Sequence, residues 1–159
     1  MKQLRLWTSG IGSQVREEVM NTRTFALIWG IVFLMLAATG FIPGLLQETH
    51  PQDPHLVVDS MYGRALGVFP VNVLHSLVHL AFGLWGVLAY RDWEKAKVYA
   101  KVVAVVYALF VVMGLVPGLN TTFGFVPLHD NDVWLHAILA APAAYFGFVH
   151  RDTPTTERR

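Results

Sequence analysis

The sequence predicts an all-α protein, a bundle of four transmembrane helices arranged as a tandem repeat of two helical hairpins with both termini in the cytoplasm. Two observations predict this fold class. The chain is 54% hydrophobic and only 14% charged, whereas soluble domains carry about 25% charged residues. Four apolar stretches are also long enough to cross a bilayer, which takes about 20 residues in a helix.

The first two apolar stretches cover residues 24–45 and 71–90. A cleaved signal peptide is the alternative interpretation of the first stretch. Its apolar run exceeds the usual signal-peptide core of about 7–15 residues, and residues 1–23 precede it. We therefore expect a transmembrane helix that is retained in the protein.

The third and fourth apolar stretches cover residues 98–116 and 133–149. The fourth is short, but the polar sequences HDND and HRD bracket it. The four spans define a membrane domain over residues 24–150, with a cytoplasmic segment 1–23 before it and a cytoplasmic tail 151–159 after it.

Basic residues are distributed unevenly between the two sides of the predicted bundle. Of the 12 Lys and Arg residues, all except Arg64 precede the first span, surround the loop between the second and third spans, or follow the fourth span. Because cytoplasmic loops carry an excess of Lys and Arg, this side is expected to be cytoplasmic. Loops 46–70 and 117–132 would then face outward.

The composition argues against several classes of function. The absence of cysteine excludes disulfides, thiolate metal sites and iron–sulfur clusters. A net charge of +1 argues against a nucleic-acid partner. The sequence contains no glycine-rich phosphate loop, nucleophile elbow or HExxH motif, and we expect a protein that is not an enzyme.

Two pairs of junctions along the chain resemble each other. The first and third spans end in GFIPGL and GLVPGL, and GVFP and GFVP precede the second and fourth spans. His75 and His136 then follow at corresponding positions. Pro and Gly at a helix end have a local explanation, since proline stops a helix and glycine accepts the left-handed conformation. The combined match favours a duplicated hairpin.

Three histidines stand out within the apolar spans. His75 and His79 are four residues apart, so they share one face of a helix. His136 lies at about the same depth in the fourth span as His75 does in the second. We expect the three to meet in the outer half of the bundle. Imidazoles on facing helices can ligate haem, and chlorophyll by the same logic, which makes all three candidate tetrapyrrole ligands.

A metal ion is a second possible occupant of this region. Imidazole and carboxylate suit Zn²⁺ or Cu²⁺, and the candidate ligands are His75, His136, His129, Asp130 and Asp132. A third interpretation needs no ligand at all. Neutral histidines can form hydrogen bonds between helices or to carbonyls freed at the Pro-Gly breaks, and Asn131 or Asp132 can cap the last helix. The sequence leaves these interpretations open.

Small residues form a stripe along the last span. At helical spacing, such residues let membrane helices approach closely, within one bundle or against a partner subunit. The residues are Ala137, Ala140 or Ala141, Ala144 and Gly147.

The segments GVFPVNVLHSLVHLAFG, GLVPGLNTTFGFVPLHDNDVWLH and AYFGFV together resemble a bacterial membrane family catalogued as domain of unknown function 4383. The resemblance covers about residues 60–150. It implies a small four-helix integral membrane protein of bacteria, including actinobacteria and cyanobacteria, and it supplies no reaction. The corresponding location is the bacterial cytoplasmic (inner) membrane or a thylakoid membrane.

From these observations we expect a non-enzymatic structural or accessory subunit of a larger membrane complex. Its partners would be the lipid bilayer and other membrane subunits, because almost no chain lies outside the spans to build an active site. The alternative is a haem-, chlorophyll- or metal-binding membrane protein that uses the histidine cluster. A proton-coupled transporter is a weaker interpretation, since no predicted span carries an acidic residue.

Overall fold

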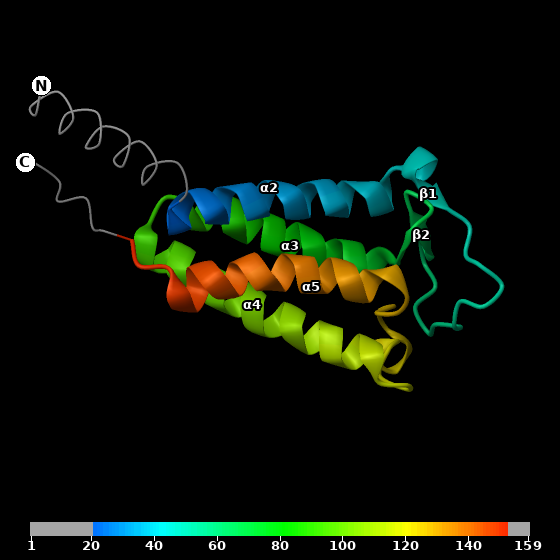
Figure 1. Ribbon diagram of the computed structural model, residues 1–159. Helices are drawn as coiled ribbons and strands as arrows, with labels where there is room; N and C mark the ends of the chain where they lie inside the picture. The colour runs from blue at the N-terminus through cyan, green and yellow to red at the C-terminus, as the bar shows by residue number, and fades with distance from the viewer. Residues whose placement is uncertain (1–20, 153–159) are drawn as a thin grey trace, which may run out of the picture.

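Four helices lie side by side along the long axis of the molecule (Figure 1). The computed structural model describes residues 21–152, so most of the predicted segment 1–23 and of the tail 151–159 lies outside the described residues. The helices are α2 (Thr22–Phe41), α3 (Val73–Ala89), α4 (Trp93–Leu115) and α5 (Asn131–Ala144), which continues into the π-helical segment η3 (Tyr145–Val149).

Three of these helices are long and apolar enough to cross a membrane: α2, α4, and α5 together with η3. The fourth, α3, is a shorter apolar helix of 17 residues. It begins later than the predicted span 71–90 because Asn72 caps it and the preceding residues form a strand. In contrast, α4 begins before residue 98, because the side chain of Asp92 accepts a hydrogen bond from the backbone N–H of Lys95 and starts the helix there.

The helices are arranged as two hairpins. Helix α2 packs chiefly against α3, and α4 packs chiefly against α5, while α2 and α3 also contact α4. Glycines set the closest approach within the first hairpin. A Cβ on Gly30 would lie 2.6 Å from the backbone nitrogen of Val87 and 2.9 Å from the carbonyl oxygen of Gly83. Small residues therefore bring the two helix backbones into direct contact.

The small-residue stripe of the last span is largely used inside the chain. Ala140 and Ala143 are buried in the core, and Gly147 lies against the backbone of Ala100 and Lys101 in α4. Among the small residues of this stripe, only Ala141 is exposed. These small residues thus explain the packing of α5 and η3 against α4.

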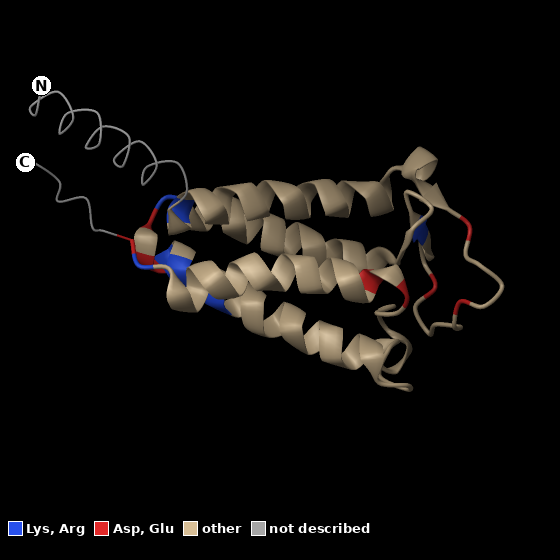
Figure 2. Cartoon of the chain, in the orientation of Figure 1, with Lys and Arg blue, Asp and Glu red and all other residues tan. Residues whose placement is uncertain are grey.

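The two ends of the bundle differ in charge (Figure 2). Basic residues gather where α2 and α4 begin, and Asp152 ties the two ends of the described chain together there. Its carboxylate accepts hydrogen bonds from the backbone N–H of Thr22, at 3.0 Å, and from the indole N–H of Trp93. The first and last described residues therefore lie at the same end of the bundle.

A three-stranded antiparallel sheet covers the opposite end of the bundle, in the order β1 (Leu46–Gln47), β2 (Gly63–Ala65) and β3 (Phe69–Val71). Leu46 pairs with Ala65, and Ala65 pairs with Phe69. The prediction of an all-α fold is wrong in this respect. Strands of two or three residues carry too little alternation of apolar and polar residues to be predicted from periodicity.

Two short 3₁₀ turns complete the loops at this end, η1 (Pro43–Leu45) and η2 (Thr122–Gly124). Asn72 joins the loops to the bundle. Its side-chain amide donates hydrogen bonds to the carbonyl oxygens of Val58, at 2.8 Å, and Phe125, at 2.7 Å, while its oxygen accepts from the backbone N–H of His75 at 3.0 Å. Asn72 is therefore the N-cap of α3, and the same side chain also connects both loops.

Candidate metal centre in the helix bundle

The three histidines singled out in the sequence meet in the core of the bundle. His75 and His79 come from successive turns of α3, and His136 comes from α5. One ring nitrogen from each residue can be chosen so that all three lie within 4.8 Å of one another. The ring centroid of His75 lies 4.6 Å from that of His79 and 5.5 Å from that of His136.

All three imidazoles are buried, with exposures of 2% for His75, 1% for His79 and 0% for His136. Neither ring nitrogen of any of the three has a hydrogen-bond partner among the described residues. Leaving a buried polar atom unpaired costs about 1–3 kcal/mol. Such a concentration of unpaired nitrogens therefore calls for a specific explanation. Among the described residues, no well-aligned hydrogen bond joins these rings to a neighbouring helix or carbonyl, although the His75 ring lies near the backbone of Pro70.

Aromatic rings enclose the cluster. Phe33 of α2 packs on His79 with a centroid distance of 5.7 Å, and Tyr107 and Phe110 of α4 pack on His136 at 5.1 Å and 5.4 Å. All four helices thus contribute to the surroundings of the three imidazoles. The surrounding side chains keep water away from the three imidazoles. A metal ion placed among them would therefore need direct ligation by the ring nitrogens to be stable.

Asp132 lies next to this cluster, one turn before His136 on α5. It is completely buried, and its Oδ2 is 3.4 Å from Nδ1 of His136, which is ion-pair range without the alignment of a hydrogen bond. The expectation that Asn131 or Asp132 caps the helix is wrong, since Asp130 occupies that position. The prediction that no span carries an acidic residue is also wrong, because the apolar helix Asn131–Val149 includes Asp132.

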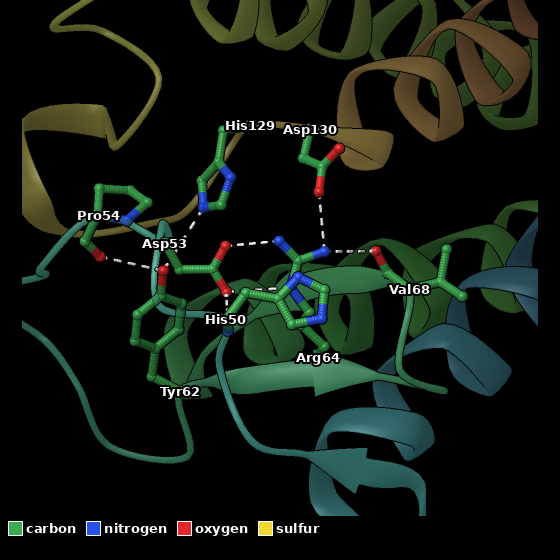
Figure 3. A network of polar contacts seen from close by, with 8 residues as sticks. All are labelled: His50, Asp53, Pro54, Tyr62, Arg64, Val68, His129 and Asp130. Atoms are coloured by element: carbon green, nitrogen blue, oxygen red, sulfur yellow. Dashed lines mark hydrogen bonds and ion pairs between the residues drawn. The ribbon is translucent and has the colours of Figure 1, made fainter.

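The predicted metal set of His75, His136, His129, Asp130 and Asp132 separates into two groups. Figure 3 shows that His129 and Asp130 belong to a network in the loops at the sheet end of the bundle. Arg64 donates from Nη1 to Oδ2 of Asp130, at 2.8 Å, and from Nε to Oδ2 of Asp53, at 3.0 Å. Within residues 21–152, the one cluster suited to a metal ion consists of His75, His79 and His136.

This network, which we call the outer ion network because it lies beyond the helix ends, comprises Asp53, Tyr62, Arg64, His129 and Asp130. Arg64 is 4% exposed, and its guanidinium also donates to the carbonyl oxygen of Val68 at 3.3 Å. The Tyr62 hydroxyl donates to the carbonyl oxygen of Pro54 and is 3.5 Å from Nε2 of His129. Sequence analysis missed this network, although the single basic residue in the acidic loops 46–70 and 117–132 was a signal for it.

The network shifts the pKa values of its members. Burial alone would raise the pKa of the Asp53 carboxyl, but hydrogen bonds from the Arg64 guanidinium and the His50 backbone N–H hold it below its usual range. Burial raises the pKa of Tyr62 to about 12, and the charge of Asp53 adds to this effect. Burial is also the main cause of the lowered pKa of His129. At neutral pH the Asp53 carboxylate is therefore charged against the Arg64 guanidinium, beside a neutral imidazole and a neutral phenol.

Acid should weaken this network in two stages. The lowered pKa of His129 means that its stabilising effect declines as the pH falls below the unfolded value of 6.5. The lowered pKa of Asp53 means that its contribution is lost further down, as the pH falls below 3.8. Between about pH 8 and about pH 5, thermal unfolding in detergent should show a smaller drop in Tm for His129→Gln than for the wild type. An equal drop in both proteins would contradict this assignment.

Comparison with known proteins places the chain in a family. The family described as "Domain of unknown function (DUF4383)" matches residues 23–149. No curated protein and no solved structure is significantly similar to the chain. The match is wider than the resemblance seen in residues 60–150, because it includes α2, and it contains His75, His79 and His136. The chain is therefore a member of the DUF4383 family.

Proposed function

We propose that this protein is an integral membrane metal protein, in which His75, His79 and His136 bind one Zn²⁺ or Cu²⁺ ion. The observation that carries the proposal is the set of three fully buried imidazoles without hydrogen-bond partners and with ligand nitrogens within 4.8 Å. Imidazole is a preferred ligand of both ions. Metal–nitrogen bonds of about 2.1 Å in a tetrahedral site place the nitrogens about 3.4 Å apart, so modest ring rotations would bring the three nitrogens to the spacing of three of the four ligands.

A single ion suits this cluster better than a tetrapyrrole. The imidazole of His75 packs directly on those of His79 and His136, and Phe33, Tyr107 and Phe110 close the sides. A haem or chlorophyll ring would have to separate these side chains. An ion would fit between their nitrogens.

The ion would join the two hairpins. Two of its ligands come from α3 in the first hairpin and the third comes from α5 in the second, and these two helices approach each other less closely than the helices within either hairpin. Sites of this kind are built in bundle cores from side chains on facing helices. The burial of all three rings keeps the proposed ion away from bulk water.

The proposed placement in the membrane follows from charge. We assign the basic end of the bundle, with Arg23, Arg91, Lys95 and Arg151, to the cytoplasm of a bacterial cell. All four helices, including the shorter α3, would cross the bilayer. The histidine cluster would then lie in the outer half of the membrane, beneath the sheet and the outer ion network.

The duplicated hairpin remains part of the proposal. Helices α2 and α4 end in the same way, with Ile42 and Val116 in extended conformations immediately before a Pro-Gly pair. His75 and His136 would then be equivalent ligands from the two copies, and His79 would be an addition in the first copy.

A role as a structural or accessory subunit of a larger complex has less support. It depended partly on the small-residue stripe of the last span, and most of those residues pack inside the chain. A partner subunit therefore has no small-residue face reserved for it on α5 among the described residues.

Metal loading tests the proposal. We expect the detergent-purified protein to bind one Zn²⁺ or Cu²⁺ per chain and to gain about 2.7 kcal/mol in stability at a free ion concentration 100 times the Kd. The variants His75→Gln and His136→Gln should lose this gain. His55→Gln, at an exposed position in the outer loop, is the matched control and should retain it. A Soret band in the purified protein, or stabilisation that persists in His136→Gln, would contradict the proposal.

A further inference from the structure

We propose that Asp132 is a positioning residue for this metal centre. Its carboxylate would accept a hydrogen bond from Nδ1–H of His136 and thereby leave Nε2 of that ring free to ligate the ion. The inference rests on the proposed function, since it concerns the same site. It assigns Asp132 a role that differs both from capping the helix and from ligating the ion directly.

The geometry places Asp132 beside one ring nitrogen of His136, Nδ1. Oδ2 of Asp132 is 3.4 Å from Nδ1 of His136, one turn away on the same helix, and both side chains are completely buried. A small rotation of either side chain would bring the pair into hydrogen-bond range. Metal-bound histidines commonly donate their second N–H to a carboxylate, which fixes the tautomer and the orientation of the ring.

No other described group accounts for the burial of Asp132. Both of its oxygens lack a hydrogen-bond partner, and its carboxylate caps no helix. Asn72, at the beginning of α3, provides a contrast, because its side chain forms three hydrogen bonds with backbone groups. The polar side chain at the start of α3 is therefore hydrogen-bonded to backbone groups. At the start of α5, in contrast, the carboxylate of Asp132 lies against a histidine ring.

Charge supports the same role. Three neutral imidazoles bring no negative charge to a divalent ion, and a buried cation without a counter-charge is strongly disfavoured. Asp132 would supply one negative charge next to the ligand shell. Conversely, the bound ion would supply the positive charge that a carboxylate in this apolar position requires.

The test compares Asp132→Asn with the wild-type full chain in detergent. Zn²⁺ affinity is measured by competition with a chelator, and the Co²⁺-substituted site is followed by its visible absorption bands. We expect the asparagine variant to bind one ion per chain with an affinity about 10–100-fold lower and with shifted Co²⁺ bands. Asp132→Glu should recover part of the affinity. Asp59→Asn, at an exposed position in the outer loop, is the matched control and should bind like the wild type.

The outcomes separate the two proposals. If the wild type binds neither Zn²⁺ nor Cu²⁺, the proposed function fails and the role of Asp132 fails with it. If the wild type binds one ion and Asp132→Asn binds it with the same affinity and the same Co²⁺ bands, only the role of Asp132 is overturned. A variant whose metal-free Tm falls while its affinity and spectrum stay unchanged would give Asp132 a structural role, and this too overturns the inference.

Discussion

Replacing Arg64 with methionine should lower the free energy of unfolding by about 3–5 kcal/mol, which is the typical cost of removing one partner from a buried ion pair. The side chains of Arg64 and Asp53 are only 5% and 3% exposed, so the variant would leave the Asp53 carboxylate buried without its counter-charge. Most of the cost should come from Asp53, because the Asp130 side chain is 47% exposed and can be solvated instead. The measurement is denaturant or thermal unfolding of the purified protein in detergent.

Two further variants test the cause of this effect. Arg91→Met removes a guanidinium from an exposed position at the other end of the bundle and should change stability by less than about 0.5 kcal/mol. The double variant Arg64→Met, Asp53→Leu should recover much of the loss, since an apolar pair of similar volume can replace a buried ion pair. A single variant as stable as the wild type would show that the outer ion network does not hold the loops together.

Substituting Gly30 with alanine should produce the second large effect, a loss of about 3 kcal/mol or more. Overpacking a core by one methyl group typically costs about 1–3 kcal/mol, and at this position the groups in the way are backbone atoms of Val87, Gly83 and Gly86. Backbone atoms cannot move aside as a flexible side chain can. Helices α2 and α3 would have to separate along their contact.

Gly44→Ala is the matched control, because a Cβ at that position would meet nothing within 4 Å. We expect Gly44→Ala to leave the Tm within a few degrees of the wild type, and Gly30→Ala to lower it strongly. If both variants behaved alike, close backbone contact would not be the basis of the first hairpin.

The helices could be predicted because each follows from a local property. An apolar stretch of about 20 residues is sufficient to indicate a helix in a membrane protein, and the observed ends differ from the predicted ones mainly where polar caps act, as at Asn72 and Asp92. The meeting of His75, His79 and His136 was also predictable, since helical spacing and the resemblance of the two hairpins placed them on facing surfaces.

The features that were missed depend on contacts between distant residues. The pairing of β1 with β2 depends on how residues 46–47 meet residues 63–65 across a long loop. Asp130 and Asp132 are two residues apart in one polar sequence, yet one binds Arg64 in the loops and the other is buried beside His136. Only the tertiary structure determines which carboxylate faces which group.

The hydrogen bonds of Asn72 have a consequence for the order in which the protein can be assembled during synthesis. One of its two acceptors, the carbonyl of Phe125, is 53 residues further along the chain. The ribosome will have delivered α2, α3 and α4 before this bond can form. The beginning of α3 therefore reaches its final state only after most of the second hairpin has been made, and the two hairpins should mature together rather than one after the other.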